Sequence, residues 1–157
     1  MRLLVSTDLT LRVLMRLSAD PKRHVSSEVL ARELQISRNH LHKIVQYLSD
    51  VGLVRTIRGA HGGVVLARPA SDIRVGEVVR GRERDQALVE CFREDGGACT
   101  LLPRCRLRGM LGAAKEAFYR HLDQYTLADC WASAGSPSSR SSGRATSRAA
   151  SRRPASP

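Results

Sequence analysis

Residues 26–52 read SSEVLARELQISRNHLHKIVQYLSDVG and decide the fold. A serine precedes each of two amphipathic runs, and serine is a favoured helix N-cap. We therefore expect a short helix over 26–34 and a longer one from Ser37 to about Asp50, separated by a break at Gln35-Ile36. Two helices joined by so tight a break are typical of a helix-turn-helix.

The second of these helices has two distinct faces. Its apolar residues recur at the spacing of one buried stripe: Leu41, Ile44, Val45 and Leu48. The opposite face carries side chains that can bind base edges or phosphates: Arg38, Asn39, His42, Lys43 and Gln46. A solvated helix face has a similar composition, but this helix follows a short helix and precedes a basic hairpin. We therefore assign DNA contacts to Arg38, Asn39, His42 and Lys43.

A β-hairpin is predicted directly after this helix. Residues 53–58 and 64–66 are two β-prone runs, and the glycine-rich segment 59–63 connects them. Arg58 and His61 lie beside glycines, which let the backbone approach a phosphate or the minor groove closely. We include both residues among the DNA contacts, although an ordinary surface turn has the same composition.

Further helices are predicted on both sides of this unit. The segment 6–19 has Ser6 or Thr7 as its N-cap and ends before Pro21, and the segment 72–90 holds another helix. The expected fold class is mainly α with a small β-hairpin wing, namely a winged helix-turn-helix domain plus a long dimerisation helix.

The long helix is expected to have Pro103 at an early position. It carries one apolar seam at intervals of three or four residues: Leu107, Leu111, Ala114, Phe118, Leu122 and Tyr125. Because the remainder of the helix is polar, the seam needs a partner, and a second copy of the same helix is the economical choice. The tail over 133–157 has no bulky apolar residue, so we expect it to be disordered.

The composition narrows the classes of function. The formal net charge is +11, and setting aside the five arginines of the tail leaves +6. A basic chain without a nucleophile–base pair, a phosphate loop or paired carboxylates favours a polyanion partner over an enzyme. No apolar run is long enough to span a membrane and no leader precedes a cleavage site, so a cytoplasmic location is expected.

Three of the four cysteines, Cys91, Cys99 and Cys105, fall within fifteen residues. In a reducing cytosol such a group is more often a metal site than a disulfide framework. Zinc modules usually carry closely paired cysteines, so the wider spacing here favours an iron–sulfur cluster while leaving zinc open. Cys130 lies twenty-five residues further on, beside Trp131, and is interpreted as a semi-buried structural residue.

Several stretches, taken in order, resemble the NsrR-type nitric-oxide-sensing repressors, which are relatives of the IscR iron–sulfur regulators. They are Thr7-Asp8 with Leu11-Arg12, Ser37-Arg38-Asn39-His40-Leu41 with Lys43-Ile44, Arg58-Gly59 with Gly62-Gly63, Pro69-Ala70 with Ile73-Arg74-Val75-Gly76, the three cysteines, and Tyr125-Thr126-Leu127-Ala128-Asp129. Each motif is weak alone, but their collinearity from residue 1 to about residue 131 is specific.

The resemblance implies a homodimer that binds double-stranded operator DNA and releases it in response to nitric oxide, which derepresses nitric-oxide-detoxification genes. It implies that Cys91, Cys99 and Cys105 hold an iron–sulfur cluster. Taken alone, Asp8 is an ordinary first-turn helix residue, but the resemblance makes Asp8 of the partner subunit a fourth, oxygen ligand to a [4Fe–4S] form. IscR-like relatives have a histidine where this chain has Arg108, which argues against their [2Fe–2S] pattern.

The chain departs from the family pattern in the wide gap between its first two cysteines, which contains Gly96-Gly97 and leaves a [2Fe–2S] form open. The expected organisation is a DNA-binding domain over 1–70, a cluster-binding loop and dimerisation helix over 71–132, and the tail. Two alternatives remain. One is an IscR-type regulator that responds to iron–sulfur supply or redox state, and the other is a zinc-stabilised winged-helix adaptor.

Overall fold

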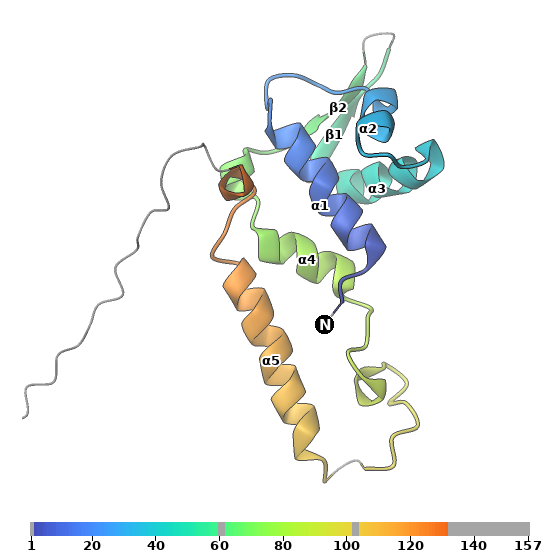
Figure 1. The fold of residues 1–157 in the computed structure, drawn as a ribbon, viewed down its shortest axis with the longest axis vertical. Coiled ribbons are helices and arrows are strands. Elements are labelled where there is room, and N and C mark those ends of the chain that lie inside the picture. The colour runs from blue at the N-terminus through green and yellow to red at the C-terminus, as the bar shows by residue number, and fades with distance from the viewer. Residues whose placement is uncertain (1, 60–61, 102–103, 132–157) are drawn as a thin grey trace, which may run out of the picture.

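The computed structural model describes residues 2–59, 62–101 and 104–131. Its elements are α1 (Val5–Ser18), α2 (Ser27–Glu33), α3 (Arg38–Asp50), β1 (Val54–Ile57), β2 (Gly63–Leu66), η1 (Ala70–Asp72), α4 (Val75–Glu83), η2 (Glu90–Phe92), α5 (Arg106–Leu122) and η3 (Ala128–Cys130). Helices α1 to α3 and the hairpin form one end of the molecule, α4 lies beneath them, and α5 extends to the opposite end (Figure 1). The fold is therefore the predicted winged helix-turn-helix followed by a long helix.

The two helices of the quoted stretch begin at the predicted caps. The Ser26 hydroxyl accepts a hydrogen bond of 3.2 Å from the Val29 amide, and the Ser37 hydroxyl accepts one of 3.2 Å from the His40 amide. Each bond satisfies an amide that the first turn of a helix leaves without an intrahelical partner. After α3, Gly52 adopts a φ of +71°, a conformation that glycine takes without steric cost and that ends the helix.

The first helix begins differently from the prediction. Its N-cap is Leu4, and neither Ser6 nor Thr7 caps it. Instead the carboxylate of Glu83, at the end of α4, accepts a hydrogen bond of 2.8 Å from the Leu4 amide and another from the Thr7 hydroxyl. The predicted cap was wrong because a residue distant in sequence satisfies this helix end, and local sequence carries no sign of it.

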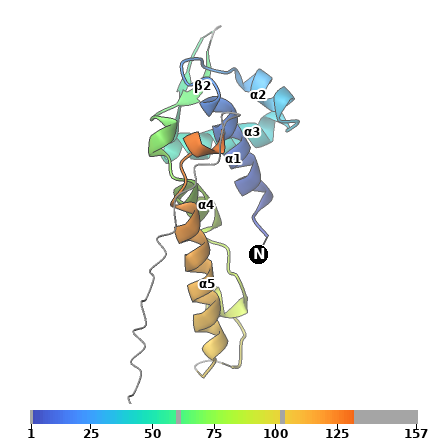
Figure 2. The same cartoon turned by 60° about the vertical axis from the view of Figure 1, so that its left-hand side comes forward.

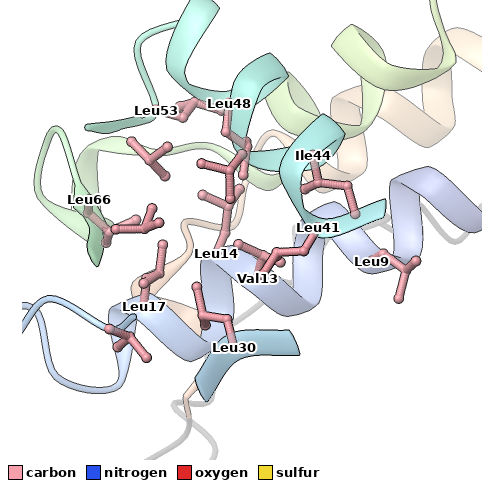
Figure 3. Packing of buried hydrophobic residues seen from close by; sticks show 14 of the residues in the cluster. Leu9, Val13, Leu14, Leu17, Leu30, Leu41, Ile44, Leu48, Leu53 and Leu66 are labelled. Carbon is pink, nitrogen blue, oxygen red and sulfur yellow. The ribbon is translucent and has the colours of Figure 1, made fainter. Parts of the chain in front are cut away.

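The core lies where α1, α2, α3 and the hairpin meet (Figure 3). The stripe predicted for α3 is buried, and it packs with side chains of α1 and α2 such as Leu14 and Leu30. Burying a leucine contributes roughly 1.5–3 kcal/mol to stability, so these contacts fix α3 on its apolar side. The same cluster includes Ile73, Val78 and Leu127, so it continues past residue 70 into the following segment.

The hairpin is a two-stranded antiparallel sheet with Val54 opposite Leu66 and Ile57 opposite Gly63. An isolated bridge between Val25 and Val64 ties the approach to α2 against β2. A Cβ at Gly63 would lie 2.6 Å from the Val25 carbonyl oxygen, so only glycine allows this close approach. The hairpin is thereby held beside the start of α2.

The long helix is shorter than predicted at both ends. It begins at Arg106, after Pro103, which lies outside the described residues, and it ends at Leu122, so Tyr125 is not part of it. The face predicted as polar includes Tyr119, which is buried and contacts Arg80 of α4. Figure 2 shows α5 projecting away from the α1–α3 unit in a second view.

No helix within the described ranges combines the length and apolar character that a membrane crossing requires. The predicted tail over 133–157 lies outside the described residues.

Candidate nucleic-acid interface and cysteine loop

A groove of about 710 Å³ opens between the start of α2, the outer face of α3 and the hairpin. Most of its lining residues are polar, with Val45 at its apolar edge: Ser26, Ser27, Glu28, Arg38, Asn39, His42, Val45, Gln46, Ser49, Thr56, Gly59 and Gly62. The groove exists because the buried stripe of α3 faces the core and turns the polar face toward the hairpin.

The structure brings together some of the residues predicted to bind DNA. Arg38, Asn39 and His42 line the groove. Lys43 and Arg58 are exposed but do not line it, and His61 lies outside the described residues. The cluster predicted on α3 is therefore largely one surface, whereas the contribution of the hairpin loop stays a prediction.

The assigned DNA contacts leave out part of this lining. Gln46 follows His42 by four residues and Asn39 by seven, the spacing of one helical face. Thr56 precedes Arg58 by two residues in the predicted β-prone run 53–58, a spacing that indicates one face of a strand, although β1 itself ends at Ile57. The helical spacing had already placed Gln46 on the polar face, although it was not assigned as a contact, and the strand spacing could have identified Thr56. Nothing local places Ser26 or Ser27 beside them.

Arg38 forms an ion pair with Glu28 across the groove. Both side chains are well exposed, with relative accessibilities of 76% and 67%, and exposed pairs contribute at most about 1 kcal/mol. The pair therefore holds the guanidinium over the groove, and because the pair is weak, Arg38 can readily leave Glu28 for another partner. A phosphate or a guanine edge can replace the carboxylate as its partner.

The three clustered cysteines lie in and around the loop that joins α4 to α5. Cys91 is buried in η2, Cys99 is half-buried, and Cys105 is the N-cap residue of α5 rather than part of its first turn. All three are free thiols. The neighbouring Phe92 packs against Gly112, and the Arg108 guanidinium lies 5.7 Å from the centre of its ring. These contacts hold the Cys91 turn against the first half of α5.

The donor set of this loop suits an iron–sulfur cluster in its chemistry, because such clusters are held by several thiolates. Arg93, Arg104, Arg106 and Arg108 lie within a few residues of the cysteines in the sequence and can offset the negative charge of such an assembly. Within the described ranges, no three His, Cys, Asp or Glu side chains are gathered closely enough to hold a metal ion. In the described part of the single chain, Cys91, Cys99 and Cys105 are therefore not gathered into one metal site, and their joint role as ligands stays a prediction.

Asp8 lies in the first turn of α1, as predicted, and is half-exposed. Its carboxylate forms an ion pair of 2.9 Å with Arg12 one turn further along the same helix. No hydrogen bond or ion pair joins Asp8 to the cysteine loop of its own chain among the described residues. Within the described part of a single chain, Asp8 is therefore paired with Arg12 and is not brought to the cysteines.

Cys130 is half-buried, as predicted, and packs against the hydrophobic core. Its thiol donates a weak hydrogen bond of 3.7 Å to the Thr126 carbonyl. Burial, and secondarily the carboxylate of Asp129, raise the pKa of this thiol above its ordinary value. A protonated, packed thiol is the structural residue that the sequence indicated.

The chain is similar to known transcriptional regulators. The chain matches the Rrf2 family, described as iron-dependent transcriptional regulators, over residues 4–133. It is 42% identical over 130 residues to the HTH-type transcriptional regulator NsrR of Bacillus subtilis, covering 82% of this chain and 89% of that protein. The NsrR regulator of Geobacillus kaustophilus is 46% identical over 130 residues, covering 82% and 88% of the two chains.

Two solved structures are similar in fold. CymR, the global cysteine regulator of B. subtilis, has a TM-score of 0.61 at 26% identity, covering 83% of this chain and 95% of that one. IscR of T. potens has a TM-score of 0.65 at 24% identity, covering 83% and 85%.

Proposed function

Because the chain belongs to the Rrf2 family of transcriptional regulators and is of its NsrR type, we propose that it is a repressor whose release from operator DNA is controlled by nitric oxide. Its relatives are named as transcriptional regulators, and the chain is likewise a DNA-binding regulator and not an enzyme. The observation that carries the proposal is the groove on α3, which gathers Arg38, Asn39 and His42 beside the hairpin.

The groove supports double-stranded DNA as the partner. Arginine can bind guanine through two hydrogen bonds and asparagine can bind adenine in the same way, both from the major groove. Lys43 and Arg58 lie outside the groove lining, where they suit phosphate contacts that set orientation without reading sequence. His61 is proposed as a further contact of the hairpin loop.

A homodimer is proposed from the surface of α5. Leu107 and Met110 are 57% and 60% exposed, and Leu101, just before this helix, is 69% exposed. So many large apolar side chains at one end of a molecule mark an interaction surface. A second α5 packed on the seam that begins at Leu107 covers it with two-fold symmetry, and two α3 helices then face successive turns of a palindromic operator.

The proposed cofactor is an iron–sulfur cluster held by Cys91, Cys99 and Cys105, with Asp8 of the partner subunit as the oxygen ligand of a [4Fe–4S] form. When bound, the cluster supplies iron atoms that nitric oxide attacks. The three thiols anchor the loop before α5, and the Asp8 carboxylate carries the link to α1 and hence to the DNA-binding unit. The carboxylate would be the weaker ligand of iron, so the link through Asp8 would be the one most easily broken.

The test uses the full chain purified without air and supplied with iron and sulfide. A duplex is selected from a random DNA library with this protein, and its affinity is measured before and after nitric oxide. We expect a coloured protein with iron and sulfide in equal amounts whose affinity falls at least about tenfold with the gas. Cys99→Ala should abolish both the colour and the response.

Other outcomes contradict this function in distinguishable ways. A colourless protein with stoichiometric zinc and no salt-dependent DNA affinity indicates a structural adaptor. A coloured protein that releases the duplex with oxygen or a chelator, but not with nitric oxide, indicates a sensor of redox state or cluster supply.

A further inference from the structure

Helix α4 contacts three other helices through three polar residues near its end. Arg80 contacts α5, Arg82 contacts α3, and Glu83 contacts α1. Figures 1 and 2 both show α4 between the DNA-binding end and α5. One helix of nine residues therefore touches the element that follows the cysteines, the helix that carries Asp8 and the helix that lines the groove.

The contact with α1 is buried. Glu83 is 6% exposed and Thr7 is fully buried, and the carboxylate accepts from both the Leu4 amide and the Thr7 hydroxyl. A carboxylate at this position satisfies the free amide and complements the positive end of the helix dipole. Because Asp8 follows Thr7 directly, the hydrogen bond between Thr7 and Glu83 helps to fix the position of Asp8.

The contact with α3 is made by an aromatic ring. The Arg82 guanidinium lies 4.3 Å from the centre of the Tyr47 ring, and Arg82 Nε is buried without a hydrogen-bond partner. Among the described residues no acidic side chain forms an ion pair with Arg82, so the ring is its main partner. A Cβ at Gly81 would lie 2.8 Å from the Tyr47 hydroxyl, which means that the α4 backbone itself approaches Tyr47 closely.

The contact with α5 is an ion pair supported by a ring. Arg80 donates hydrogen bonds of 2.8 and 3.4 Å to the two carboxylate oxygens of Asp123, and its guanidinium lies 5.0 Å from the centre of the Tyr119 ring. The bond to Asp123 raises the pKa of Arg80 above its ordinary value. A movement of α5 would therefore act on α4 through two contacts of Arg80, one with Asp123 and one with Tyr119.

We propose that α4 transmits the state of the cysteine loop to the DNA-binding groove, with Arg82 and Glu83 as positioning residues that couple α5 to α3 and α1. This inference rests on the proposed function, and it names the residues that would link the cysteine loop to the groove. Because the three contacts lie within the last turn of one short helix, they move together, so displacement of α5 shifts Tyr47 and Leu4 together. The recognition face of α3 then changes its position relative to the second subunit.

The test compares two affinities for the selected duplex, one of protein loaded with iron and sulfide and one of the same protein without them. Their ratio measures coupling, because it cancels any effect that is common to both states. Arg82→Ala should lower this ratio at least about fivefold. Arg84→Ala removes the same charge from the exposed C-cap position of the same helix and should leave the ratio within about twofold.

Substitutions of Tyr47 test the ring contact independently. Tyr47→Leu should lower the ratio as Arg82→Ala does, and the double variant should show no further loss, because both changes remove one interaction. Tyr47→Phe keeps the ring and should keep the ratio. Amide hydrogen exchange in the cluster-free protein should rise over 44–50 with Arg82→Ala and stay unchanged with Arg84→Ala.

The two levels of failure are separable. If the wild-type ratio is about one, the proposed function fails and the inference with it. If the wild-type ratio is large and Arg82→Ala keeps it, with only a lower unfolding midpoint, Arg82 is merely structural and the inference is overturned. Should Arg82→Ala not fold, Glu83→Gln decides, since it keeps an acceptor for Leu4 but loses the charge, and an unchanged ratio counts against the inference.

Discussion

The indole Nε1–H of Trp131 donates a hydrogen bond of 2.7 Å to the carbonyl of Met15, 116 residues earlier in the chain. The bond fastens the segment after α5 to the last turn of α1. A second tie lies nearby, where the Leu127 amide donates a bond of 2.8 Å to the Ile73 carbonyl. After α5 the chain thus returns to the end of the molecule that holds α1, α2, α3 and the hairpin, and it is tied there by both bonds.

Replacing Trp131 by Phe should lower the free energy of unfolding by about 0.5–1 kcal/mol, the lower part of the range for one hydrogen bond, because the side chain is half-exposed. Urea denaturation of the two proteins measures the change. An unchanged midpoint would mean that water replaces the indole without loss.

A pair of glycine substitutions tests how closely α4 and α5 approach. A Cβ at Gly76 would lie 2.1 Å from Asp123 Oδ1 and 2.8 Å from the Asp123 backbone nitrogen. Gly76→Ala should therefore destabilise the fold by roughly 1–3 kcal/mol. Gly109→Ala, on α5, meets no atom outside its own helix within 4 Å and should be neutral or stabilise by up to about 1 kcal/mol. Equal effects of the two changes in thermal unfolding would refute this assignment.

The phosphate contact proposed for Lys43 can be tested through salt. The slope of log K against log salt falls by about 0.9 for each phosphate that the protein ceases to neutralise, so Lys43→Ala should reduce it by about 1.8 in a dimer with two copies. Lys115→Ala removes the same charge from α5, away from the groove, and should leave the slope unchanged. Titration by fluorescence anisotropy at several salt concentrations separates the two, and identical slopes for both variants would remove Lys43 from the interface.

The seam on α5 predicts a dimer that one charge disrupts. Leu107 is 57% exposed in a single chain, so Leu107→Glu leaves the core intact but buries a carboxylate in the proposed interface. The dimer dissociation constant should rise at least about tenfold. Ala113→Glu places the same charge on the far side of the helix and serves as the control. Sedimentation equilibrium gives both constants, and a Leu107→Glu protein as dimeric as wild type excludes this seam.

The Cys130 thiol predicts a pH dependence of stability. Its pKa is raised in the folded chain, so folding favours the protonated form, and that contribution is complete below the ordinary thiol pKa of about 8.5. It is lost as the pH rises through the folded value. The free energy of unfolding under reducing conditions should therefore fall more steeply above about pH 8.5 in wild type than in Cys130→Ala. Parallel curves would show that the thiol ionises freely.

Much of the fold follows from local chemistry. The serines before α2 and α3 accept the expected amide bonds, and the four apolar residues of α3 are buried as their spacing indicates. The fold class and the resemblance to NsrR-type regulators could also be predicted, because they depend on short motifs that lie in order along the chain. The groove residues Arg38, Asn39 and His42 came from that pattern as well.

The errors occur where distant segments meet. Ser6 and Thr7 looked like caps of α1, but Glu83 takes that role from a position 76 residues beyond Thr7. Tyr119 looked like part of a solvated face, yet α4 covers it. The spacing of apolar residues indicates which side of a helix is buried. It does not indicate which residues of another element will contact that helix.

The sequence by itself determined the winged helix, its recognition face and the group of cysteines, because caps, periodicity and residue type act within a few positions of each other. Only the tertiary structure decided that α4 joins three helices through Arg80, Arg82 and Glu83. Each of those contacts depends on where a whole helix lies. The position of the helix follows from packing in the shared core, which residues from several distant segments build together.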